Sequence, residues 1–290
     1  MVRLMKTKKQ NALGIRISDT FHEQECKLNA SSAAHLEQIQ QFVIADAHYV
    51  TLNDPRFAGD WLSDMPLHAP QSNSDLRFRH YFDDPKLTAT RAGIELRVEY
   101  RGDKSADGWP YKQVIKVGAS GSDEDHTLDR LEYPAKLRKG LPVLEAVEGA
   151  GAAFLKAAFN KNKLADIQLF PLIQIVSQRW KLLYHPGGDK DTQIELSTDM
   201  ARARAFTGFT WDLFQVEMEI KKGDPAALAD EETRLRKVFR ALIVETRSKP
   251  APGFDHLAGV LDKKPMRDFV RINLSQGRFR VYPELQNPLP

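Results

Sequence analysis

The chain contains a single cysteine, Cys26, among its 290 residues. An intramolecular disulfide therefore cannot form, and a zinc site built from several cysteines is excluded. No apolar run approaches the roughly 18 residues that a membrane-spanning helix needs, and the basic first residues lack the apolar stretch of a secretory signal. Because disulfides are rare in reducing compartments, we expect a cytoplasmic protein with no membrane partner.

The chain also lacks a strong excess of charge of either sign. Its formal net charge is +3, which is too weak to indicate a nucleic-acid partner. The apolar fraction of 42% and the charged fraction of 28% are ordinary for a globular protein, and a chain of this length can bury a sizeable core. Any functional charge must therefore lie in local clusters.

The hydrophobic pattern predicts an α+β fold with a largely antiparallel sheet. We expect helices from caps at 29–32 to about 47, over 142–160 and over 225–246, with the tail beyond 254 partly helical. Residues 1–14 are expected to be a flexible basic N-terminus, 15–260 one domain, and 261–290 an extension packed on it; 48–74 are expected to be irregular. Strands are predicted at 15–28, 76–82, 94–100, 111–117, 127–133, 169–184, 192–196 and 212–220.

Two of these strands repeat the same arrangement of charge. Glu23, Glu25 and Lys27 alternate with Gln24, Cys26 and Leu28, and a second strand far along the chain carries Glu217 and Glu219 with a lysine next in phase. One interpretation is a set of half-exposed strands with charges facing water. The other is a sheet closed into a barrel with a charged interior.

Electrostatics favours the closed sheet. Carboxylates on one strand face repel each other unless a cation lies between them, and the face opposite Glu23 and Glu25 lacks a run of large apolar residues. Carboxylate oxygens suit Mg²⁺ or Mn²⁺, whereas arginine and lysine suit phosphate oxygens. A closed sheet with both would bind a metal-chelated polyanion.

Further motifs give this pattern a family likeness. The segment YFDDPKLTATRAGIELR at 81–97 follows the first charged strand. In its order and spacing, the chain from about 15 to 260 resembles the CYTH superfamily, the triphosphate tunnel metalloenzymes. Later elements match at YKQVIK, which ends in Lys116, and at Arg130 with Glu132, Arg179, Glu195 with Asp199, Glu217 with Glu219, and Ser248 with Lys249.

The resemblance implies a closed eight-stranded antiparallel β-barrel with flanking helices that binds a triphosphate compound together with Mg²⁺ or Mn²⁺. It implies catalytic roles for Glu25, Lys27, Glu217 and Glu219, and Glu195 is a further candidate for the metal. The implied phosphate-binding residues are Lys27, Arg97, Lys116, Arg130, Arg179 and Lys249. The implied metal ligands are Glu23, Glu25, Glu132, Asp199, Glu217 and Glu219.

One residue departs from the family pattern. Glu99 occupies a position where the family usually has arginine, which removes one phosphate contact; Arg77, Arg79 and Lys112 are candidates to compensate. We therefore expect a metal-dependent hydrolase of triphosphate compounds, with inorganic tripolyphosphate first among substrates, and keep a non-catalytic polyanion-binding module as an alternative. A nucleotidyl cyclase is the third option, disfavoured because Phe21-His22 stands directly before Glu23. A homodimer is left open.

Overall fold

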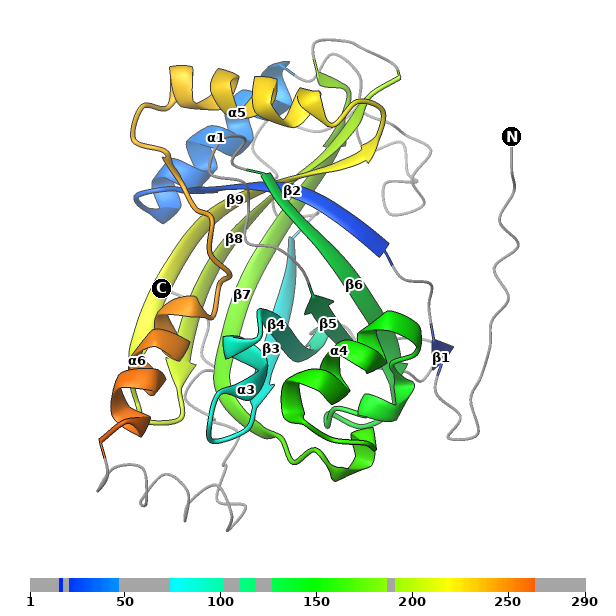
Figure 1. Cartoon of the computed structure of the whole chain (residues 1–290). Coiled ribbons are helices and arrows are strands. Elements are labelled where there is room, and N and C mark those ends of the chain that lie inside the picture. The colour runs from blue at the N-terminus through cyan, green and yellow to red at the C-terminus, as the bar shows by residue number, and fades with distance from the viewer. Residues whose placement is uncertain are drawn as a thin grey trace.

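We analysed a computed structural model that describes residues 16–17, 21–46, 74–101, 110–117, 127–186 and 191–263 (Figure 1). The predicted N-terminal segment 1–14, nearly all of the irregular connection at 48–74, and most of the extension at 261–290 lie outside these residues. None of the helices in the described ranges is long and apolar enough to cross a membrane.

A single antiparallel sheet forms the body of the molecule. Its strand order is β1-β6-β5-β4-β3-β7-β8-β9-β2-β10, and β2 additionally pairs with β6. Each strand from β2 to β9 therefore has a partner on both sides, and the predicted antiparallel α+β fold is confirmed. The strands are β1 (Arg16–Ile17), β2 (Phe21–Asn29), β3 (Ser74–Asp83), β4 (Ile94–Arg101), β5 (Tyr111–Val117), β6 (Thr127–Leu137), β7 (Phe170–Tyr184), β8 (Gln193–Ala205), β9 (Thr210–Lys222) and β10 (Ile243–Val244).

The helices on the outside of the sheet cover its apolar face in two groups. Helices α1 (Ala33–Asp46) and α5 (Ala226–Val238) pack on one cluster that includes Leu28, Leu196 and Val216 (Figure 1). The second group covers the apolar face of β4, β5 and β6. It consists of α3 (Thr88–Arg91), η2 (Leu144–Ala146), α4 (Gly149–Phe159) and η3 (Leu164–Asp166).

The prediction of one helix over 225–246 is wrong in its second half. Helix α5 ends at Val238, and Phe239 has non-helical backbone angles of φ −110° and ψ 79°. The chain then forms β10, which pairs with the end of β2. The apolar spacing that predicted a longer helix continues past the end of α5. Leu242 is buried in the same cluster as α5, although the backbone there is no longer helical.

Helix α6 (Ala251–Leu261) lies on the opposite face of the sheet, which we call the inner face. Phe254 and Leu257 belong to a buried cluster with Ala201 and Ala203, which continue the inner face of β8. A Cβ at Gly253 would lie 2.3 Å from the ring of Trp211, so only glycine allows this close approach. Small residues on strand and helix therefore seat α6 against one end of the inner face and bring the segment before it into the interior.

Candidate functional site

The charged strand faces meet in one pocket, which we call the central pocket. Its wall comes from seven strands and from the segment that precedes α6, and the free space between the side chains is about 40 Å³. All six predicted phosphate-binding residues line it. The lining residues are Glu25, Lys27, Arg79, Tyr81, Glu95, Arg97, Lys116, Arg130, Arg179, Glu217 and Lys249.

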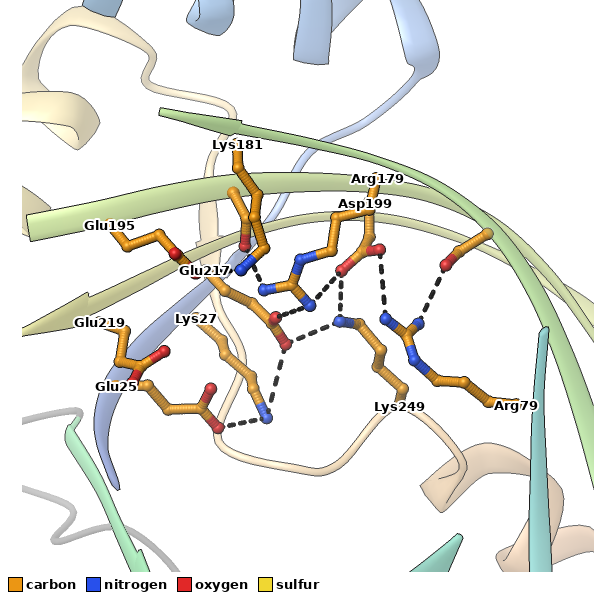
Figure 2. A network of polar contacts seen from close by, with 12 residues as sticks. Glu25, Lys27, Arg79, Arg179, Lys181, Glu195, Asp199, Glu217, Glu219 and Lys249 are labelled. Atoms are coloured by element: carbon orange, nitrogen blue, oxygen red, sulfur yellow. Dashed lines mark hydrogen bonds and ion pairs between the residues drawn. The ribbon is translucent and has the colours of Figure 1, made fainter. Parts of the chain in front are cut away.

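Lys249 enters this pocket from the segment between β10 and α6 (Figure 2). Its Nζ atom donates to Asp199 Oδ2 at 2.6 Å and to Glu217 Oε1 at 2.7 Å. Burial lowers the pKa of Lys249 to about 8, against the opposing attraction of the two carboxylates. The lysine is therefore a cation whose charge can change near neutral pH.

Arg179 on β7 shares both of these acids. Its Nη1 atom lies 3.3 Å from Asp199 Oδ2 and 3.1 Å from Glu217 Oε2, and its Nη2 donates to Ser197 Oγ at 2.5 Å. Burial by itself would raise the pKa of Glu217, but the charges of Lys249 and Arg179 hold it well below its ordinary value. The same two cations lower the pKa of Asp199 against its burial. These four side chains form a compact network of full charges (Figure 2).

The β2 side of the pocket holds a second set of ion pairs. Lys27 Nζ lies 2.9 Å from Glu25 Oε1 and 3.9 Å from Glu217 Oε1, and Arg130 also contacts Glu25. Lys27 and Glu25 are each only 3% exposed. Cations and acids here are paired at short range and largely removed from water, so a ligand must exchange with existing ion pairs.

Lys116 and Glu132 form the remaining predicted pair. Their Nζ and Oε1 atoms lie 2.8 Å apart, and the two residues are directly opposite in the β5–β6 ladder. In the β2–β6 ladder Glu23 is opposite Arg130; its side chain is outside the part of the chain that the structure describes. The predicted residues thus come together on neighbouring strands.

Three carboxylates lie in one row across three strands. Glu25 is directly opposite Glu219 in the β2–β9 ladder, and Glu219 is directly opposite Glu195 in the β8–β9 ladder. Lys221 Nζ lies 2.5 Å from Glu219 Oε1 and 3.9 Å from Glu195 Oε1, and Lys181 also contacts Glu195. Like charges directly opposite in a sheet are destabilising, so this row needs cations.

The donor set of this row suits a hard divalent metal. Among the described residues, no three His, Cys, Asp or Glu side chains form a metal cage. Mg²⁺ does not require one, because it is usually held by one or two carboxylates together with substrate phosphates and water. Glu25 and Glu219, facing each other beside a cationic pocket, fit that kind of site.

Three residues on the pocket wall, Arg79, Tyr81 and Glu95, were outside the predicted site, although Arg79 was named as a candidate to compensate for Glu99. Arg79 and Tyr81 are each 1% exposed, and the Tyr81 hydroxyl has no hydrogen-bond partner among the described residues. Burial raises the pKa of Tyr81 to about 12, with a further contribution from Glu95. The alternation of Arg77, Arg79 and Tyr81 in the predicted strand was the signal that placed them on one face.

The YFDDP motif has a structural role in positioning this wall. Asp83 is completely buried, and its carboxylate accepts hydrogen bonds from the backbone N–H groups of Asp84, Ala89 and Thr90 at 2.8 to 2.9 Å. These bonds fix the turn between β3 and β4. As a result, Tyr81 is directly opposite Arg97 in the β3–β4 ladder.

Comparison with known proteins gave matches to solved structures alone; no family model and no curated protein matches the chain. A proposed adenylate cyclase from Bacillus halodurans is 14% identical, covers 80% of this chain and 97% of its own, and has a TM-score of 0.47. A proposed adenylyl cyclase from Hippeastrum, described as having a dominant triphosphatase activity, is 13% identical over 81% and 96%, with a TM-score of 0.42. A triphosphatase of the Mimivirus capping enzyme is 10% identical over 74% and 87%, with a TM-score of 0.37.

The three structures named here carry cyclase or triphosphatase names at identities of 14% or less. At TM-scores below 0.5 they record a likeness and carry no residue roles. The assignment of function below therefore rests on the central pocket.

Proposed function

We propose that the chain is a divalent-metal-dependent hydrolase of triphosphate compounds, with inorganic tripolyphosphate as the first substrate to consider. The observation that carries this proposal is the convergence of all six predicted phosphate-binding cations on one pocket. They come from five different strands and from the segment before α6. A cluster of buried cations from so many elements is suited to a ligand with several negative groups.

The strand pairings support a tunnel as the setting of this site. The order of the sheet places β6 and β2 far apart, yet these strands pair over six residue positions. In our proposal this pairing closes eight strands, β2 to β9, into a barrel around the central pocket. Helix α6 then covers one end of its interior.

Phosphate oxygens would take the places that carboxylates now occupy. Lys27, Arg130 and Lys116 each contact a glutamate, and Arg179 and Lys249 share Glu217 and Asp199. Guanidinium and ammonium groups bind phosphate with the same charge-assisted hydrogen bonds. A triphosphate would therefore replace the carboxylates as the partners of these cations, and the cations would stay paired.

We assign Glu25 and Glu219 to the metal. Glu23 and Glu217, two residues away on the same strand faces, are further candidates. A bound Mg²⁺ or Mn²⁺ would neutralise charge on the phosphate oxygens. Glu217 and Glu219 would orient the attacking water by accepting its hydrogen bonds. Lys27, Arg179 and Lys249 would offset the negative charge that develops on the transferred phosphoryl group.

The contacts of Asp199 favour a different role from the metal ligand expected from the sequence. Its carboxylate is completely buried and lies among three cations: Lys249, Arg179 and Arg79. Glu217 also contacts three cations, but it lines the central pocket and Asp199 does not. We therefore assign Asp199 to holding these cations in place, and Glu195, in the row of Glu25 and Glu219, is the stronger candidate for an additional metal ligand.

A substrate panel tests the proposal. Tripolyphosphate, ATP and thiamine triphosphate would each be incubated with the protein and with Mg²⁺ or Mn²⁺, and released phosphate measured. We expect release from at least tripolyphosphate, and its loss in Glu219→Gln but not in Glu37→Gln, an exposed position on α1. No release from any of the three with either metal would overturn the hydrolase, and tripolyphosphate binding without release would favour the binding module. Formation of cyclic AMP from ATP would favour a cyclase. A cytoplasmic location stays a prediction, and a homodimer stays open.

A further inference from the structure

Glu99 is an acid beside a pocket that we propose to bind phosphate. In the sheet it is directly opposite Arg79 on β3 and directly opposite Lys112 on β5. Its Oε2 atom lies 3.4 Å from Arg79 Nε and 3.4 Å from Arg97 Nε. One carboxylate oxygen therefore bridges two arginines from neighbouring strands.

The bridge lies beside the pocket, because Glu99 is two residues from Arg97 on the same face of β4. Arg79 and Arg97 both line the central pocket, whereas Glu99 is absent from its lining. The contacts use the Nε atom of each arginine, so both guanidinium groups keep their terminal nitrogens for other partners. Glu99 thus contacts both cations from outside the pocket that they line.

Glu99 is a full negative charge in this position. Burial by itself would raise the pKa of Glu99, but the charges around it lower the pKa well below its ordinary value. An ionised acid accepts stronger hydrogen bonds from arginine than a neutral group does. The cations responsible are Arg97, Lys112, Arg79 and Arg77, in order of their effect.

Arg79 is held on two further sides. Its Nη1 atom donates to Ser177 Oγ at 3.0 Å, and its Nη2 lies 3.8 Å from Asp199 Oδ1. With 1% of its surface exposed, it is among the largest fully buried side chains in the described part of the chain. Burying an arginine this completely is costly unless its charge serves a partner, which sets Arg79 apart from the exposed Lys112.

We propose that Arg79 is an additional phosphate-binding residue of the central pocket and that Glu99 is the positioning residue that aims Arg79 and Arg97 into it. This inference rests on the proposed function, because it assigns both residues to the same triphosphate site. It also decides among the three residues that could compensate for the acid at position 99. Arg79 lines the pocket, and Arg77 and Lys112 do not.

Substitution of Glu99 distinguishes two roles: positioning the two arginines, or competing with phosphate for them. If Glu99 only competed with phosphate for the arginines, Glu99→Ala would tighten the binding of an anion. If it positions them, Glu99→Ala frees two arginines that repel each other, and binding weakens. Glu99→Gln removes the charge but keeps an oxygen that can accept the hydrogen bond from Arg79 Nε, so it should keep most of the binding.

The test is a calorimetric titration of tripolyphosphate into wild type, Glu99→Ala, Glu99→Gln, Arg79→Ala and the Arg79→Ala/Glu99→Ala double variant, with phosphate release measured in parallel. We expect Glu99→Ala and Arg79→Ala each to weaken binding by about tenfold or more, the size of one lost charge-assisted contact. Glu99→Gln should stay within about threefold of wild type. Because Glu99 acts partly through Arg79, the loss in the double variant should be smaller than the product of the two single losses.

Three results would overturn the inference: tighter binding by Glu99→Ala, equal losses in Glu99→Ala and Glu99→Gln, or independent losses in the double variant. Lys112→Gln is the matched control for a change of charge beside Glu99, and it should alter binding by less than about threefold. Binding without phosphate release in the wild type would contradict the hydrolase alone and leave the comparison of variants intact. Absence of any tripolyphosphate binding would contradict both.

Discussion

The two sides of the central pocket use charge in opposite ways. On the β2, β8 and β9 side, Glu25, Glu219 and Glu195 face one another across the ladders. On the β3, β4 and β7 side, Arg79, Arg97 and Arg179 line the pocket together with one acid, Glu95, and Glu99 contacts Arg79 from outside the lining. The first side concentrates negative charge that a cation would relieve, and the second concentrates positive charge that an anion would relieve.

This difference explains how one pocket could bind a metal and a polyanion together. Neither side is left without counter-charges, since lysines pair with the acids and acids pair with the arginines. The excess charge is nevertheless negative on the first side and positive on the second. A triphosphate would therefore bind with its metal toward β2 and β9, and with further phosphate oxygens toward β3, β4 and β7.

The largest expected effect comes from the acidic side. Glu25→Gln and Glu219→Gln should each reduce Mg²⁺-dependent phosphate release by at least about 100-fold, since each removes a carboxylate from the proposed metal site. Binding of tripolyphosphate without metal should be kept or become tighter. Measuring release with metal and calorimetric binding without it separates the two effects; a loss of metal-free binding in both variants would contradict the division between the sides.

Removal of the cation that the segment before α6 contributes should give the reverse pattern. Lys249→Met removes a buried cation that contacts Asp199 and Glu217, so tripolyphosphate binding without metal should weaken by about 10- to 100-fold. Calorimetry measures this directly. The exposed Lys156 on α4 provides the control, since Lys156→Met should bind as the wild type does. Unchanged binding in Lys249→Met would remove this lysine from the site.

The charge of Lys249 should also appear in the pH profile. The pKa of Lys249 is lowered to about 8, so the side chain is protonated below that pH and loses its charge as the pH rises through it. Tripolyphosphate affinity should therefore fall above about pH 8. Lys249→Arg, which stays charged, should flatten that fall, and Lys181→Arg is the comparison because the pKa of Lys181 is also lowered to about 8. An equally steep profile in Lys249→Arg would assign the titration to another group.

The smallest effect is expected at Tyr81, a pocket residue whose hydroxyl should contribute little to the free energy of unfolding. Its buried hydroxyl has no partner among the described residues, so Tyr81→Phe should change the free energy of unfolding by less than about 1 kcal/mol. Tyr184 is equally buried, but its hydroxyl donates to Glu231, and Tyr184→Phe should cost about 1 to 3 kcal/mol. Chemical denaturation of both variants tests the contrast, which equal losses would contradict.

Much of the pocket could be predicted from local patterns. The alternation in FHEQECKL and in the strand that carries Glu217 placed charges on one strand face, and the two faces do contribute to one pocket. The register across strands could not be predicted in this way. That Glu195 is opposite Glu219 depends on how β8 and β9 pair, which is decided by packing over the whole sheet.

Three features of the fold were not predicted, and each has a local cause. Strand β8 extends to Ala205 rather than ending at 196, because alanines at alternate positions have a low strand propensity and gave no signal. Helix α3 has four residues, too few for a periodic pattern to show. The sequence does not show that Asp83 fixes the turn, because its hydrogen-bond partners are backbone groups, which every residue has.

The central claim is that this pocket hydrolyses a triphosphate with the help of a divalent metal. Phosphorus NMR of tripolyphosphate incubated with the wild-type protein and Mg²⁺ or Mn²⁺ tests it most directly. We expect the tripolyphosphate signals to be replaced by those of pyrophosphate and phosphate in equal amounts, and to stay in place with Glu219→Gln. Tripolyphosphate signals that persist unchanged with the wild type and both metals would contradict it.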